Sequence, residues 1–566
     1  MRSEQDERDV THDNGERTID RRRFMTAAGL TTLAAVAGVG CAGDPAPVQG
    51  ASGKAAGTSG AASGDGQPAF VHNEATIASL QEQMQRGSLT STALTEAYLA
   101  RIAAVDAAGP TLRSVLETNP DALTIAAERD AERKAGKVRG PLHGIPVLVK
   151  DNLDTGDRMQ TTAGSLALVG TPATRDAHVV AKLREAGAVI IGKTNLSEWA
   201  NFRSTRSSSG WSGRGGQTKH PYVLDRNPCG SSSGTGTAIA ANLATVGIGT
   251  ETDGSIICPS SICGLVGLKP TVGLVSRAGI IPISATQDTA GPMTRSVSDA
   301  AALLQAIAGR DEQDPSTSAA PAATPDYAAA LVKGALKGAR IGVGRNLAGF
   351  NPAADAAFNK AIDTLRAAGA VIVDPANVPT VGKYDDAEFQ VLLYEFKDGL
   401  NRYLASRGET VSHKTLAALI AYNREHADTE MPWFAQEIFE QAEAKGPLTD
   451  AAYRNALELC RRASREQGLD ALFREHQLDA LVAPSNAPSW VTDHVNGDKY
   501  SGGNSSVAAV AGYPSLTVPM AYVHGLPLGI SFIGLAWSEA KLLGYGYDFE
   551  QQVMARQAPK FLRTVE

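Results

Sequence analysis

Short apolar segments alternate with helical patterns through the middle of the chain, and this alternation limits the folds that the sequence can adopt. The segment IPVLVKDN ends an apolar strand on Lys150, and AVIIG follows a helix and a turn at Gly187. A third helix-to-strand unit is GTGTAIAANLATVGIGTETDG. Helices that alternate with buried apolar strands are typical of α/β layers. The residue pattern therefore predicts an α/β fold with a largely parallel sheet.

Helical patterns flank this region on both sides. The stretch EATIASLQEQMQRGSLTSTALTEAYLARIAAVD predicts two amphipathic helices, with Gly87 ending the first and Ser88 or Thr90 capping the second. Residues 386–476 are mostly helical in pattern and predict a lobe beside the sheet. A chain of 566 residues accommodates more than one domain, or one large α/β domain with insertions.

The N-terminus is typical of an export signal. Residues 1–41 contain the basic group Arg21–Arg22–Arg23, which resembles a twin-arginine motif, and an apolar run that ends at Cys41. The run from 27 to 40 is shorter than the roughly 20 residues of a membrane span. We expect an exported protein, periplasmic or at the cell surface, lipid-anchored at Cys41; the alternative is a plain signal peptide in which Cys41 is incidental. Residues 42–70 are rich in Gly, Ala and Ser and predict a flexible tether.

Charge and cysteine content exclude some classes of partner. The formal net charge of −7 argues against nucleic acid, which requires clustered Lys and Arg. Cys229, Cys258, Cys263 and Cys460 form no C-x-x-C pair or zinc-type spacing, so disulfides and free thiols both stay open. No metal or organic cofactor is expected.

Two motif matches have weak structural support. Gly187 to Thr194 fits G-x-x-x-x-G-K-T, but its middle residues are themselves the expected strand rather than a phosphate-binding loop. Gly230 to Gly234 fits the G-x-S-x-G elbow of α/β-hydrolases, with Ser232 as nucleophile and a later histidine as base. The preceding HPYVLDRNP is a poor central strand, so this esterase-type reading is an alternative only.

The two serine-rich runs, NPCGSSSGTG and GIGTETDGSI, contain no histidine. A serine hydroxyl needs a neighbouring base to become a nucleophile, and lysine is the remaining candidate. Lysine accepts a proton only when burial or nearby positive charge lowers its pKa. Lys150, at the end of an apolar strand, is suitably placed.

Three blocks, LHGIPVLVKDN, CGSSSGTG and GTETDGSIICPSSICGLVGLKPTVGLVSRAGIIP, resemble in order and spacing the core of the amidase signature family. The later GYPSLTVP and GLPLGISFIG resemble its C-terminal blocks. The resemblance implies a catalytic domain over 71–566, with a mixed central β-sheet covered by helices on both faces and the helical lobe inserted. It implies a Ser-cisSer-Lys triad: Ser255 is the nucleophile, Ser231 the bridging serine on a cis peptide, and Lys150 the base. Four backbone N–H groups are implied as the oxyanion hole, those of Thr252, Asp253, Gly254 and Ser255.

The sequence departs from the common family pattern where GGSSGG is CGSSSGT and DTGGS is ETDGS. These departures, which include Glu251 and Asp253, resemble the peptide amidase branch, which removes C-terminal amides of peptides and releases ammonia. Aryl amides, small carboxamides and esters are alternative substrates. The sequence predicts no particular oligomeric state. A non-catalytic, tethered binding lipoprotein is a further alternative, against which the intact Lys150, Ser231 and Ser255 argue.

Overall fold

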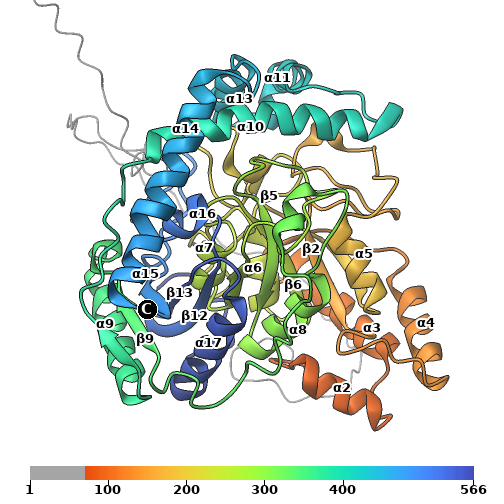
Figure 1. Cartoon of the computed structure of the whole chain (residues 1–566). Coiled ribbons are helices and arrows are strands. Elements are labelled where there is room, and N and C mark those ends of the chain that lie inside the picture. Colours follow the sequence, from red (N-terminus) through yellow and green to blue (C-terminus); the bar gives the residue numbers. More distant parts are fainter. Residues whose placement is uncertain (1–69, 566) are drawn as a thin grey trace, which may run out of the picture.

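The computed structural model describes residues 70–565 (Figure 1). The expected export signal at 1–41, lipidation at Cys41 and the tether at 42–70, apart from Phe70, lie outside these residues and stay predictions. None of the helices between residues 70 and 565 combines the length and the apolar character that a membrane span requires.

The described residues form an α/β structure around one sheet of 11 strands, with a separate two-stranded ribbon. The order in the large sheet is β1-β3-β2-β6-β8-β7-β12-β13-β11-β9-β10. Its strands are β1 (Val115–Thr118), β2 (Pro146–Lys150), β3 (Val189–Thr194), β6 (Val246–Glu251), β7 (Val266–Lys269), β8 (Thr289–Thr294), β9 (Arg340–Val343), β10 (Val371–Val373), β11 (Ala480–Pro484), β12 (Ser515–Val523) and β13 (Leu526–Ile533). The ribbon pairs β4 (Trp211–Ser212) with β5 (Gly216–Gln217).

The sheet is mixed, so the expectation of a largely parallel sheet from the residue pattern is wrong. Six neighbouring pairs are antiparallel and four are parallel. The helix–strand alternation correctly locates the parallel group β3-β2-β6. It fails where consecutive strands pair directly: β12 and β13 form a hairpin around Gly525, whose φ is +75°.

Helices cover both faces of the sheet. On β12, Leu516 and Val518 face Gly546 of α17, whereas Thr517 lies on the side of Ser261 of α7. Alternate residues of a strand point to opposite faces, so α7 and α17 lie on opposite sides. The helices are α2 (Ile77–Gln85), α3 (Ser91–Arg101), α4 (Ala122–Lys134), α5 (His178–Glu185), α6 (Ser233–Ala240), α7 (Ile257–Ile262), α8 (Val297–Ile307), α9 (Pro352–Ala367), α10 (Asp385–Ser406), α11 (Leu416–Glu425), α12 (Ala427–Glu430), α13 (Glu437–Glu443), α14 (Ala451–Arg461), α15 (Asp470–His476), α16 (Ser506–Ala511) and α17 (Glu539–Val553).

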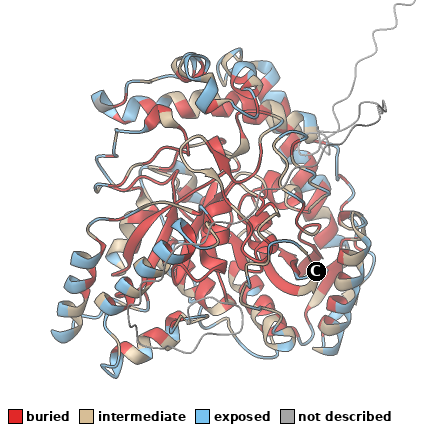
Figure 2. Ribbon diagram, turned by 180° about the vertical axis from the view of Figure 1, so that it is seen from behind, coloured by how far each residue is buried: buried red, intermediate tan, exposed pale blue. Residues whose placement is uncertain are grey.

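The helical lobe expected at 386–476 corresponds to α10–α15. Figure 1 shows α10, α11, α13 and α14 together at one end of the molecule. Leu393, Leu400, Phe439 and other buried residues there form a second apolar core that includes Trp199 from the sheet side. The main core lies along the sheet, where buried residues dominate (Figure 2). The lobe therefore packs onto the chain segment that follows β3.

Candidate active site

Lys150 lies fully buried at the carboxyl end of β2. Its Nζ donates hydrogen bonds to Ser231 Oγ and Thr250 Oγ1, each at 2.8 Å, and lies 3.4 Å from the Thr250 carbonyl oxygen. β2 lies between β3 and β6 in the sheet, so the lysine stem is enclosed by neighbouring strands. The structure thus brings together two residues that are 81 positions apart, Lys150 and Ser231.

Burial lowers the pKa of Lys150 from its usual 10.5 to about 7. The negative charges of Asp288 and Glu251 oppose this shift without cancelling it. A lysine in these surroundings is substantially neutral near pH 7 and can accept a proton.

Ser231 is fully buried in the loop that leads into α6, and its peptide bond with Gly230 is cis. The Ser231 carbonyl accepts a hydrogen bond from the Ser197 N–H at 3.0 Å, which fixes this loop against the segment after β3. The next residue, Ser232, donates its N–H to the Ser255 carbonyl at 3.1 Å. The two serine runs therefore lie side by side.

Ser255 follows β6 in a tight loop and lines a pocket. The residue keeps a small exposed fraction, 9%, whereas Ser231 has none. Gly254 has φ +84°, and a Cβ there would lie 2.9 Å from Ser505 Oγ, so both the conformation and the space favour glycine. Of the two serines, only Ser255 is in contact with the pocket.

Thr250 and Asn152 belong to this cluster but were missed by the sequence reasoning. Thr250 Oγ1 accepts hydrogen bonds from both Lys150 and Asn152 Nδ2, the second at 3.0 Å. A signal existed, since Asn152 lies two residues after Lys150 and Thr250 directly precedes the ETDGS motif. These contacts fix the direction of the lysine amine.

Asp288 and Gln287 contact the loop that carries Ser255, at Thr252. Asp288 accepts the Thr252 hydroxyl at 2.6 Å, and Gln287 Nε2 lies 3.4 Å from the Thr252 carbonyl oxygen. Gln287 also donates to Glu388 of α10 at 2.8 Å. The helical lobe is thereby connected to the loop beside Ser255.

Glu251 and Asp253, which depart from the family pattern, each have structural partners. Glu251 Oε2 accepts the N–H groups of Ile256 and Ile257 at 2.7 and 2.9 Å, at the start of α7. Asp253 accepts hydroxyl hydrogen bonds from Ser505 and Ser506 at 2.6 and 2.8 Å. Both carboxyl groups therefore stabilise the backbone of the Ser255 loop.

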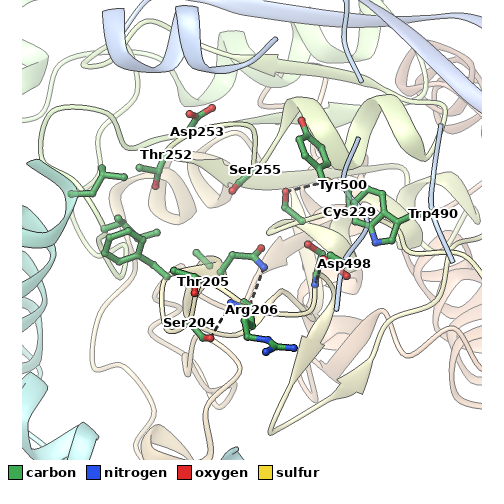
Figure 3. A pocket seen from close by; sticks show the side chains of 18 residues that line it. Ser204, Thr205, Arg206, Cys229, Thr252, Asp253, Ser255, Trp490, Asp498 and Tyr500 are labelled. Atoms are coloured by element: carbon green, nitrogen blue, oxygen red, sulfur yellow. Dashed lines mark hydrogen bonds between the residues drawn. The ribbon is translucent and has the colours of Figure 1, made fainter. Parts of the chain in front are cut away.

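The pocket beside Ser255 is lined by a mixture of apolar, aromatic and polar side chains (Figure 3). Phe202, Ile283 and Leu392 of α10 contribute apolar surface. Other lining residues come from three loops, 204–209, 229–230 and 490–500, and include Arg206, Trp490, Asp498 and Tyr500. The lining thus combines apolar surface with polar and charged groups.

A disulfide connects the first serine run to the helix that follows the second. The sequence had left open whether these cysteines are paired or free. Cys229, which precedes Gly230, is bonded to Cys258 in α7, with their Cα atoms 6.0 Å apart. Cys263 and Cys460 are both buried and lie outside this disulfide. The disulfide links the backbone beside Ser231 to the helix that follows Ser255.

The elbow reading of Ser232 is not supported. Its hydroxyl donates to the Thr250 carbonyl at 3.0 Å and accepts the Thr250 N–H at 3.2 Å, so it connects two backbone segments. An elbow requires a strand directly before the serine. Within residues 70–565 the strand that precedes Ser232 is β5, which ends at Gln217.

Fold and site together define an α/β protein in which a fully buried lysine lies beside two serine-bearing loops. The family model "Amidase" matches residues 93–543, so the chain belongs to the amidase family. It is an amidase, a hydrolase that acts on amides.

Solved structures and sequence relatives agree with this assignment. A structure of the peptide amidase PAM with the competitive inhibitor chymostatin is 54% identical, with a TM-score of 0.85 over 87% of this chain and 100% of that one. Native peptide amidase from Stenotrophomonas maltophilia is 53% identical, with a TM-score of 0.84 over 87% of this chain and 99% of that one. A probable amidase of Arabidopsis thaliana is 42% identical over 87% of this chain and 93% of its own length.

Proposed function

We propose that this amidase works through Ser255 as nucleophile, Ser231 as proton relay and Lys150 as base. The observation that carries the proposal is the 2.8 Å hydrogen bond between Lys150 Nζ and Ser231 Oγ in a fully buried setting. Neutral Lys150 takes a proton from Ser231 as Ser231 takes the proton of Ser255. The Ser255 oxygen then attacks the amide carbonyl.

The negative charge of the tetrahedral intermediate falls on the former carbonyl oxygen. Backbone N–H groups of the loop Thr252 to Ser255 are the donors that we assign to it, because fixed dipoles stabilise charge that appears only during reaction. The proton held by Lys150 returns through Ser231 to the leaving nitrogen. Ammonia departs and leaves an acyl ester on Ser255, which water hydrolyses to a carboxylic acid by the same relay.

We propose the C-terminal amides of peptides as substrates. Support comes from the likeness to the two solved peptide amidases over 87% of this chain. Further support is the mixed lining of the pocket, since an amide-bearing residue presents both an apolar side chain and a polar backbone. The test is ammonia release by residues 71–566 from N-acetylated peptide amides, compared with acetamide and an aryl amide of matched concentration. Peptide amides should have the highest kcat/KM, and a preference for acetamide or the aryl amide would reject this substrate class.

Activity should depend on pH through the protonation of Lys150. Because the pKa of Lys150 is lowered to about 7, the amine is protonated and unable to act as a base below that pH. We expect log kcat/KM for a neutral peptide amide to rise with unit slope up to about pH 7 and to level off above it. Asp288→Asn removes a negative charge that raises the pKa of Lys150, so the variant should keep this limb but shift it to lower pH. A flat profile from pH 5.5 to 8.5 would contradict the role of Lys150.

A further inference from the structure

An exposed aromatic stack joins the helical lobe to a loop next to the pocket-lining residues Ser207 and Ser209. Trp433 packs face to face on His494, with ring centroids 4.7 Å apart and planes 15° apart. Trp433 is 48% exposed and the neighbouring Val495 is 79% exposed. The next residue along the lobe, Phe434, is instead buried against Trp211. The three residues Trp433, His494 and Val495 are called the rim stack below.

The rim stack contacts a loop that forms part of the pocket wall, through Ser208. His494 Nδ1 lies 3.3 Å from Ser208 Oγ, and both neighbours of Ser208, Ser207 and Ser209, line the pocket. Exposed Arg206 on the same loop also lines the pocket, so the pocket reaches solvent on this side. The loop that carries His494 contributes Trp490, Asp498 and Tyr500 to the lining.

The chemistry of the rim stack suits an apolar ligand. Burial lowers the pKa of His494 below its usual 6.5, so the imidazole is neutral at pH 7. The nearby Asp493 carboxylate accepts hydrogen bonds from the N–H groups of Val495 and Asn496. Its negative charge is thus stabilised by the backbone of its own loop. An exposed aromatic side chain such as Trp433 gains free energy when an apolar group covers it.

We propose that the rim stack is a specificity site that binds an apolar side chain of the peptide substrate, N-terminal to the residue whose amide is cleaved. The inference rests on the proposed function. A peptide amide with its reacting carbonyl at Ser255 must extend its N-terminal part out of the pocket. Arg206 is the exposed residue of the pocket lining, so we place the exit at the 204–209 loop, which the rim stack contacts through Ser208. Longer substrates with an apolar residue at that point therefore bind more tightly than short ones.

The experiment compares three blocked substrates: N-acetyl-leucinamide, and the amides of N-acetyl-Gly-Gly-Leu and N-acetyl-Phe-Phe-Leu. For the unaltered enzyme the Phe-containing amide should have the lowest KM. Trp433→Ala should raise that KM about three- to tenfold with kcat unchanged, and should leave N-acetyl-leucinamide kinetics as they were. Trp433→Phe should restore most of the affinity, and Leu123→Ala, which removes an exposed apolar side chain from α4, should change nothing.

Two outcomes overturn the proposal in different ways. Hydrolysis of all three amides with equal KM, or an equal effect of Trp433→Ala on short and long substrates, would reject the binding role of the rim stack. The proposed substrate class would stand. Absence of ammonia release from every peptide amide would reject the proposed substrate class and the rim stack with it. A thermal melt of Trp433→Ala identifies any general loss of folded enzyme.

Discussion

Replacement of Ser255 by alanine should abolish ammonia release from peptide amides while the fold is retained. The substitution removes the proposed nucleophile, and loss of a nucleophile from a catalytic triad lowers kcat by about 10⁴-fold or more. The Ser255 hydroxyl is small and lies at a pocket, so the free energy of unfolding should change by less than about 1 kcal/mol. Ammonia release and a thermal melt measure the two effects.

The matched controls for this substitution are two nearby serines. Ser261 lies in α7, six residues after Ser255, and its buried hydroxyl has no hydrogen-bond partner among residues 70–565. Ser261→Ala should therefore keep full activity. Ser232→Ala loses two hydrogen bonds to Thr250 and should lower activity without abolishing it. Retained activity in Ser255→Ala, or complete loss only in Ser232→Ala, would contradict the assignment.

Replacement of Lys150 by methionine should have an effect nearly as large. Methionine fills the same buried space but cannot accept a proton, so we expect kcat to fall by at least about 10³-fold. Ser231 and Thr250 lose a hydrogen-bond donor, which costs about 1–3 kcal/mol of stability. The measurement is kcat per folded molecule at pH 8, where the amine of the unaltered enzyme is neutral.

Lys193 provides the comparison for a buried lysine that does not contact the serines. It lies in β3, and its Nζ donates to the Leu153 carbonyl at 2.6 Å and to Thr161 Oγ1 at 3.0 Å. Lys193→Met should lower the melting temperature and retain most of the kcat per folded molecule. If both lysine variants lose activity and stability in parallel, Lys150 has only a structural role.

The sequence predicts the local elements around the site well. The apolar segment ending at Lys150 forms β2, and the segment after Gly187 forms β3. Thr90 caps α3, as expected, by accepting the Ala93 N–H. These predictions succeed because hydrophobic pattern and capping depend on residues close in sequence.

Pairings between distant segments were not available from the residue pattern. The mixed sheet depends on which strands become neighbours, and no local signal shows that β8 pairs antiparallel with both β6 and β7. Predicting the disulfide between Cys229 and Cys258 would have required knowing that the two serine runs lie side by side. The roles assigned to Ser231 and Ser255 came from family resemblance, since periodicity alone does not rank one serine above another.

The most direct test of the central claim is covalent labelling of the purified domain by a fluorophosphonate, followed by mass spectrometry of its peptides. The account predicts one phosphonate adduct, on Ser255, that competing peptide amide slows and Lys150→Met greatly reduces. An adduct on Ser232, or none on an enzyme that releases ammonia, would contradict Ser255 as the nucleophile.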